Sequence, residues 1–111
     1  PKPSSAASDV YKRQVHRLPA APGIRVPHMG WNALRTMRPS ALLDGVADGA
    51  SAYFVHSYAA PVTADTVAAS DHGSLFTAVV QHGRLCGAQF HPERSAATGA
   101  RILRNFLEMD F

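Results

Sequence analysis

The chain has 111 residues, 46% hydrophobic and 17% charged, which suits one globular domain with a buried core. Its single cysteine, Cys86, excludes a disulfide framework and a CxxC metal site and fits a reducing cytoplasm, and no apolar run reaches the roughly 18 residues of a membrane helix. The pI of 9.5 suggests nucleic-acid binding, but residues 15–111 carry eight arginines against seven acidic residues and no lysine, so we expect no nucleic acid and no membrane as partner.

The first 14 residues are small and polar and follow no clear period, so we expect a disordered or non-native leader at 1–14 and a domain over 15–111. Two short strands are predicted at 15–18 and 24–26, separated by a loop rich in proline and glycine. The segment PHMGWN at 27–32 follows. A tryptophan and a methionine beside a glycine indicate either a packed turn or a contact surface.

The middle of the chain carries the strongest strand pattern. Residues 33–44 include a proline and predict a loop with a short helix, for which Ser40 is the N-cap. The segment SAYFVHSY at 51–58 is rich in aromatic and β-branched residues and predicts a strand. Residues 63–70 predict another strand.

A hairpin and a helix are predicted at the end of the chain. Segments 76–81 and 85–90 are apolar and flank His82-Gly83-Arg84, which predicts a three-residue hairpin loop. The spacing in 95–109 predicts an amphipathic helix with Ser95 as its N-cap. Its apolar face would hold Ala100, Leu103, Phe106 and Leu107, and its polar face Arg101, Arg104 and Asn105.

The residues that follow the predicted strand 85–90 carry the clearest chemical signal. Alternate side chains of extended backbone point the same way, so His91 and Glu93 are expected on one side of the chain. A carboxylate beside an imidazole orients it and stabilises its protonated form. The pattern predicts a base and its orienting acid, two members of a nucleophile–base–acid group.

Cys86 is a poor candidate for the nucleophile. It lies five residues before His91 on one predicted strand, about 16 Å away at roughly 3.3 Å per residue, and the odd separation places the two side chains on opposite faces. A nucleophile and its base need to lie about 3 Å apart. We therefore expect Cys86 to be a small buried apolar residue.

The other histidines predict no metal site. A zinc site formed by His28, His56 and His91 has suitable residue types, but no pair of these residues has a recognised ligand spacing. His56, inside the aromatic strand, is expected to be a hydrogen-bonded structural residue. The three histidines near turns, His16, His72 and His82, are expected to face solvent.

Three motifs together resemble the class I glutamine amidotransferases: PHMGWN at 27–32, YFVHSY at 53–58 and QFHPERS at 89–95. The FHPE motif gives only the superfamily, whereas the other two in combination are similar to the glutaminase subunits of imidazole glycerol phosphate synthase. The resemblance implies an α/β fold: part of a three-layer, flavodoxin-like domain with a mostly parallel central sheet, a β-hairpin and a closing C-terminal helix. Residues 15–111 would form the C-terminal half of that domain.

The resemblance implies hydrolysis of glutamine to glutamate and ammonia, and passage of the ammonia to a (β/α)8-barrel cyclase subunit in histidine biosynthesis. His91 would be the base and Glu93 its orienting acid. Ser57 and Tyr58 would hold the amino-acid end of glutamine. No metal or organic cofactor is implied for this step.

The resemblance also implies a docking face for the cyclase subunit, formed by Met29, Trp31, Tyr53 and Arg94. The family's nucleophilic cysteine lies upstream of the PHMGWN segment, and Cys86 does not match it. We therefore expect this chain by itself to be inactive. Two alternatives stay open: an amidotransferase of another biosynthetic pathway, and a non-catalytic docking fragment.

Overall fold

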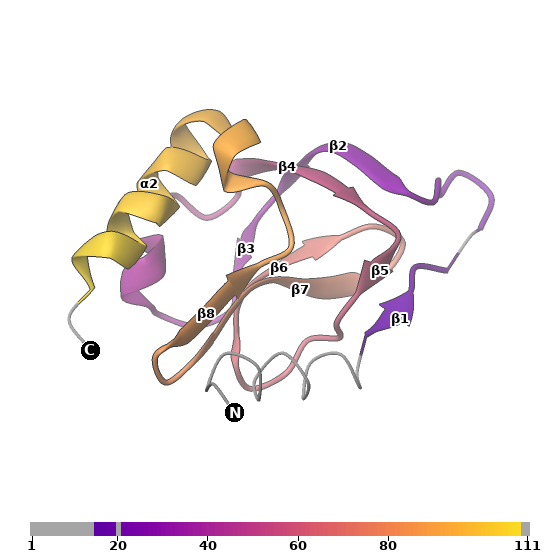
Figure 1. The fold of residues 1–111 in the computed structure, drawn as a ribbon. Coiled ribbons are helices and arrows are strands. Elements are labelled where there is room, and N and C mark those ends of the chain that lie inside the picture. Colours follow the sequence, from indigo (N-terminus) through magenta and orange to yellow (C-terminus); the bar gives the residue numbers. More distant parts are fainter. Residues whose placement is uncertain (1–14, 20, 110–111) are drawn as a thin grey trace, which may run out of the picture.

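The computed structural model describes residues 15–19 and 21–109, so the expected leader at 1–14 lies outside the described residues. Short antiparallel strands make up most of the regular secondary structure, and a helix follows the last strand (Figure 1). The elements are β1 (His16–Arg17), β2 (His28–Ala33), β3 (Arg35–Thr36), η1 (Ala41–Leu43), β4 (Ser51–His56), β5 (Tyr58–Ala59), β6 (Thr66–Asp71), β7 (Leu75–His82), β8 (Leu85–Ala88), η2 (Pro92–Arg94) and α2 (Ala96–Glu108). Among the helices described, none combines the length and the apolar character that crossing a membrane would require.

The strands form three ladders, β1–β5, β2–β4 and β3–β6–β7–β8. The α/β class, the hairpin and the closing helix agree with the expectation. The mostly parallel sheet is a correction for these residues, because every strand pair in the described part of the chain is antiparallel. For β6–β7 and β7–β8 the physical reason is connection length, because tight turns join these strands, whereas parallel neighbours need a long crossover.

Residues 28–32 of the segment PHMGWN, expected as a turn or a contact surface, form most of strand β2, which pairs with β4 over six residues. Its inward and outward positions alternate: His28 is buried, whereas Met29 and Trp31 are exposed. Gly30 has a φ of 126°, a conformation that L side chains rarely adopt, so the strand needs a glycine here. The expected strand at 24–26 is absent, and Ile24 makes only an isolated bridge.

The second half of the chain agrees with the predicted elements apart from their ends. The β7–β8 hairpin pairs His82 with Leu85, so its loop has two residues rather than three, and Gly83 adopts a φ of 59°. Strand β8 ends at Ala88 instead of continuing to residue 90. Ser40 caps η1 as predicted, since its side chain accepts a hydrogen bond from the amide of Leu42.

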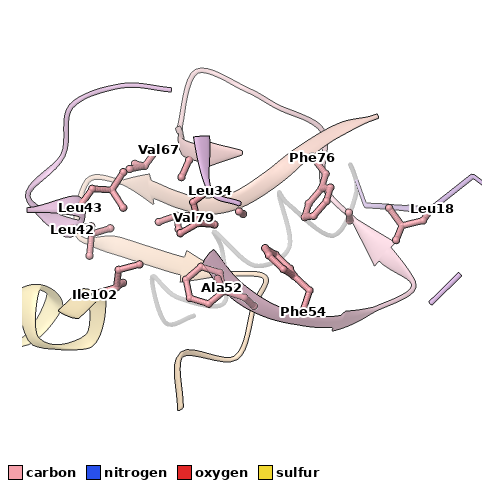
Figure 2. Packing of buried hydrophobic residues seen from close by; sticks show 14 residues of the cluster. Leu18, Leu34, Leu42, Leu43, Ala52, Phe54, Val67, Phe76, Val79 and Ile102 are labelled. Atoms are coloured by element: carbon pink, nitrogen blue, oxygen red, sulfur yellow. The ribbon is translucent and has the colours of Figure 1, made fainter. Parts of the chain in front are cut away.

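The core lies between β4, the four-stranded sheet and α2 (Figure 2). Phe54 is fully buried and packs edge-to-face against Phe76 and Phe90, with ring centroids 5.6 and 5.8 Å apart. Leu34 and Val79 fill the centre of the cluster, in which aliphatic side chains from several elements meet. Contacts of this kind, distributed over many residues, carry most of the stabilisation of a small domain.

Helix α2 buries a different face from the one its apolar spacing predicted. Its buried residues are Gly99, Ile102 and Asn105, whereas Leu103, Phe106 and Leu107 stay 41–80% exposed. Asn105 is buried because its amide donates to two main-chain carbonyls at the end of η1, Leu42 and Asp44, each at 2.8 Å. A buried amide with two hydrogen-bond acceptors is well satisfied, so burying this polar side chain costs little free energy.

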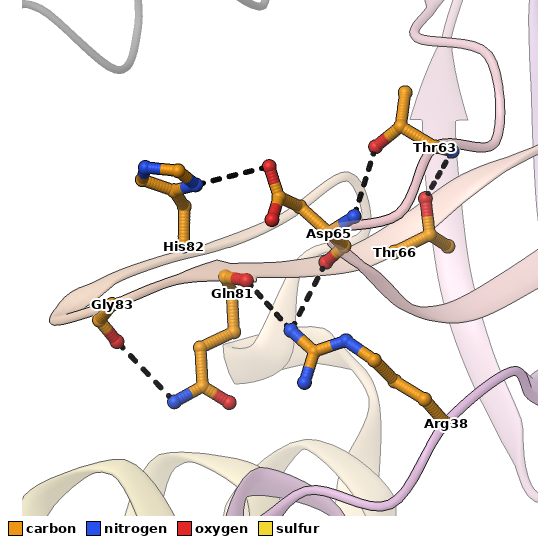
Figure 3. A network of polar contacts seen from close by, with 7 residues as sticks. All are labelled: Arg38, Thr63, Asp65, Thr66, Gln81, His82 and Gly83. Atoms are coloured by element: carbon orange, nitrogen blue, oxygen red, sulfur yellow. Dashed lines mark hydrogen bonds and ion pairs between the residues drawn. The ribbon is translucent and has the colours of Figure 1, made fainter.

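A polar network holds the open end of the β6–β7 ladder (Figure 3). The guanidinium of Arg38 donates to the carbonyls of Gln81 at 2.7 Å and Asp65 at 3.5 Å, and the carboxylate of Asp65 contacts His82 at 3.1 Å. Thr66 accepts from the amide of Thr63 at 2.8 Å, which closes the turn before β6. The network satisfies main-chain groups near the irregular pairing of β6 with β7 and is structural.

Candidate active site

His91 is held where the chain leaves strand β8 and reaches β4. The amide of Gln89 donates to the carbonyl of Ala78 at 2.8 Å, and Phe90 then enters the core with 3% exposure. The amide of His91 donates to the carbonyl of Tyr53 at 3.1 Å. These contacts attach the chain on both sides of a buried phenyl ring and bring His91 to the outer edge of β4.

The imidazole of His91 meets the carboxylate of Glu93, so the expected contact is present. The extended backbone on which that expectation rested is wrong, because residues 92–94 form the 3-10 helix η2. Nδ1 and Oε1 lie 2.9 Å apart, and the two side chains are 46% and 63% exposed. The pKa of Glu93 is lowered, first by its own main-chain amide and further by His91 and Arg94, so the carboxylate is ionised at neutral pH. An ionised carboxylate only accepts, so Nδ1 carries the proton and Nε2 is the basic nitrogen of the neutral ring.

Ser57 and Tyr58 lie at the opposite end of β4 from His91. The Ser57 carbonyl accepts from the amide of Leu18 at 2.7 Å, and Tyr58, in β5, is 56% exposed. Four residues of extended chain separate Ser57 from Tyr53, which is about 13 Å at roughly 3.3 Å per residue. The structure therefore does not bring these two residues into contact with His91.

Three of the four residues expected on a docking face, Met29, Trp31 and Tyr53, lie on the outer side of the β2–β4 ladder. Met29 and Trp31 are 65% and 55% exposed, and Trp31 faces Tyr53 in the register, with ring centroids 5.8 Å apart. Arg94 is exposed at the end of η2. Met29, Trp31 and Tyr53 thus form an outward apolar row, and Tyr53 links that row to the main chain of His91.

Cys86 lies in β8 and packs against the hydrophobic core, but it is half-buried rather than buried as expected. With Ile102 and Phe106 it lines an apolar groove between β8 and α2, and His91 is not among the residues of that groove. Burial raises the pKa of the thiol, which keeps it protonated and unreactive at neutral pH. The structure thus gives Cys86 no role as the nucleophile.

His28 and His56 form a buried, hydrogen-bonded pair. The expectation that His56 is a hydrogen-bonded structural residue is confirmed, whereas its pairing with His28 was not predicted. The two residues face each other across the β2–β4 ladder, and His28 Nδ1 lies 2.9 Å from His56 Nε2. Among the described residues, no three His, Cys, Asp or Glu side chains are grouped as a metal site. His72 was expected to face solvent. It is instead half-buried, stacks on His28 at 4.1 Å and contacts the carbonyl of Arg25.

The hydrogen-bond partners of His28 and His56 determine which nitrogen of each ring carries the proton. His56 Nδ1 faces the carbonyl of Tyr58 at 3.0 Å, so it must donate, and Nε2 must accept from Nδ1 of His28. Nε2 of His28 then accepts a hydrogen bond from the side-chain amide of Asn32 at 3.4 Å. Burial, followed by the rings of His72 and His56, lowers the pKa of His28 to about 4, and burial also lowers the pKa of His56. Both rings are therefore neutral.

Gly99 is a second feature that sequence reasoning missed. A Cβ placed there would overlap the carbonyl oxygen of Pro92 and lie 2.7 Å from its carbonyl carbon. Helix α2 therefore touches the His91–Glu93 turn through main-chain atoms. A glycine inside a helical pattern often indicates a close approach of another segment, so the sequence could have predicted this contact.

Comparison with known proteins gives one family. The model for glutamine amidotransferase class-I matches residues 5–109. Imidazole glycerol phosphate synthase subunit HisH of Xanthomonas euvesicatoria pv. vesicatoria (strain 85-10) is 78% identical over 96 residues, which are 86% of this chain and 48% of that relative. Subunit HisH of Xylella fastidiosa (strain 9a5c) is 71% identical over 97 residues, 87% of this chain and 48% of that relative. The chain thus spans about half the length of the curated relatives it matches.

The low pKa of His28 predicts that acid destabilises the fold. Unfolding restores the ordinary value of 6.5, so the unfolded chain takes up a proton that the folded chain refuses between pH 6.5 and about 4. Stability is therefore full above pH 6.5 and falls by about 3 kcal/mol as the pH drops to 4. Urea unfolding of the chain at several pH values measures this loss. His28→Gln should flatten the dependence, whereas exposed His16→Gln should leave it, and an unchanged slope in His28→Gln contradicts the prediction.

The contact at Gly99 predicts that a better helix former destabilises this helix. Helix propensity alone would make Gly99→Ala more stable by about 1 kcal/mol. The new methyl group must instead displace Pro92, which we expect to lower the unfolding free energy by about 1–3 kcal/mol. Ala100→Gly, at an exposed neighbour, is the control and should cost only the propensity difference. A gain in stability for Gly99→Ala would show that the turn moves freely.

Proposed function

Because this chain belongs to the class-I glutamine amidotransferase family, we propose that it is the part of a glutaminase subunit that supplies the base and its orienting acid. The observation that carries the proposal is the 2.9 Å bond from Nδ1 of His91 to the carboxylate of Glu93. This bond fixes the tautomer and leaves Nε2 for proton transfer. The 46% exposure of the His91 side chain keeps that nitrogen accessible to a substrate.

The reaction would be hydrolysis of the side-chain amide of glutamine through a thioester. Nε2 of His91 takes the proton of the thiol, the resulting thiolate attacks the amide carbon, and His91 delivers that proton to the departing ammonia. The imidazole then removes a proton from water, which attacks the thioester and releases glutamate and the thiol. Glu93 holds the ring and stabilises it while it is protonated. This sequence needs no metal or organic cofactor.

The thiol would come from a part of the complete subunit outside residues 15–111, since Cys86 is the only cysteine of the sequence and lines the β8–α2 groove. Ser57 and Tyr58 would hold the amino-acid end of glutamine. These two residues follow the last residue of β4, whereas His91 contacts Tyr53 within that strand. In the complete subunit the thiol would therefore lie between Ser57–Tyr58 and His91.

The relatives named subunit HisH support a narrower proposal for the partner and the pathway. We infer that the ammonia passes to a (β/α)8-barrel cyclase subunit in histidine biosynthesis, in the cytoplasm. The outward row of Met29, Trp31 and Tyr53, together with the exposed Arg94 of η2, which contacts β4, would form the docking face. Large exposed apolar side chains next to an arginine are typical of the centre of such an interface.

A hybrid subunit tests the activity. The 96 aligned residues of the Xanthomonas euvesicatoria HisH are replaced by their counterparts from this chain. We expect the hybrid to hydrolyse glutamine and to support growth without histidine in a strain that lacks HisH. His91→Ala should lower the hydrolysis rate about 100-fold to 10,000-fold, because the base is lost.

His16→Ala, an exposed histidine in β1, is the control and should be fully active. A folded hybrid without glutaminase activity would refute the proposed reaction. Hydrolysis without growth would point to the amidotransferase of another pathway.

The docking face predicts a separate binding defect. Trp31→Ala in the hybrid should weaken binding to the Xanthomonas cyclase subunit by about 30-fold or more, because a central tryptophan contributes about 2 kcal/mol or more. Titration calorimetry measures the affinity. The matched control is Leu107→Ala, a side chain 80% exposed on α2. Equal affinities of the Trp31 and Leu107 variants would exclude this face as the interface.

A further inference from the structure

The hydroxyl of Ser95 lies at a buried junction between strand β4 and the turn that carries His91. Ser95 is 0% exposed. Its Oγ accepts a hydrogen bond from the amide of Tyr53 at 2.9 Å and donates one to the carbonyl of His91 at 2.7 Å. A single oxygen therefore joins main-chain groups of two segments that lie far apart in the sequence.

The two bonds complete a clamp on the main chain of His91. Its amide donates to the carbonyl of Tyr53 at 3.1 Å, and its carbonyl accepts from the amide of Arg94 at 3.0 Å as well as from Ser95. Both peptide groups that flank the Cα of His91 are thus fixed. With its main chain immobile, the imidazole has only its own side-chain torsions left, and the bond to Glu93 sets these.

Helix capping does not account for this serine. At the first position before a helix, a serine hydroxyl ordinarily accepts from one of the first helical amides. Ser95 makes no such bond to α2. Its hydroxyl is directed back towards β4 and His91 instead, so the residue serves the turn rather than the helix.

We propose that Ser95 is a positioning residue for the glutaminase reaction: it holds His91 in the orientation in which Glu93 fixes its tautomer. The inference rests on the proposed function and deepens it. Ser95 is buried and reaches no substrate, so it acts only through the main chain of His91. Errors of about 1 Å in the position of a base lower rates by about 100-fold.

Kinetics of the hybrid subunit test the proposal. We expect Ser95→Ala to lower kcat about 10-fold to 100-fold with little change in the KM for glutamine, because the base and not the substrate site is misplaced. Ser95→Thr retains the hydroxyl and should recover most of kcat.

The matched control is Ser70→Ala. Ser70 is also 0% exposed, and its hydroxyl also donates to a main-chain carbonyl, that of Ala33 at 2.8 Å. It should lower the unfolding midpoint by a similar amount while kcat stays unchanged. Equal losses of kcat in the two alanine variants, or an unchanged kcat in Ser95→Ala, would overturn the proposal.

A second readout does not depend on activity. In the wild-type protein, NMR of labelled histidine should show His91 as a single tautomer with the proton on Nδ1. Ser95→Ala should give mixed tautomers at this residue, as Glu93→Gln should, whereas Ser70→Ala should leave the signal unchanged. A single retained tautomer in Ser95→Ala would overturn the positioning role. An inactive wild-type hybrid with the expected NMR pattern would instead refute the proposed function alone.

Discussion

Two hydrogen bonds between the main chain of Tyr53 and residues 91–95 hold the candidate site to the sheet. Strand β8 ends before this segment begins, so the ladder of the four-stranded sheet does not fix it. Its position depends on the buried ring of Phe90, on the two bonds to Tyr53 and on the contact of Gly99 with Pro92. Sheet, turn and helix therefore meet at one point, and the imidazole of His91 projects from it.

The candidate site was predictable because its two side chains are neighbours in the sequence. His91 and Glu93 are two residues apart, so the sequence itself places the two side chains within reach of each other, although tertiary contacts hold the turn that carries them. The strand pattern of β4 and the capping of η1 by Ser40 were predictable for the same reason, since each depends on local propensity. The exclusion of Cys86 rested on strand geometry, and the structure agrees with it.

The features that were missed depend on residues far apart in the sequence. The sequence of β2 does not show that His28 will face His56, because no local property encodes the partner of a strand. Asn105 was assigned to the exposed polar face of its helix. It is buried because its side-chain amide donates to carbonyls at the end of η1, and only the tertiary structure brings these carbonyls close. The role of Ser95 was hidden likewise, because a serine before a helix ordinarily indicates a cap.

The bond between His28 and His56 has a consequence for strand alignment. A slip of β2 by one residue would turn its buried side chains to solvent, so hydrophobicity alone rejects it. A slip by two residues keeps every side chain on its proper face, so burial of apolar side chains disfavours it only weakly. Such a slip would, however, separate the two imidazoles and leave buried nitrogen atoms without partners. The histidine pair thus selects the register of β2 against β4, and this register places Trp31 opposite Tyr53.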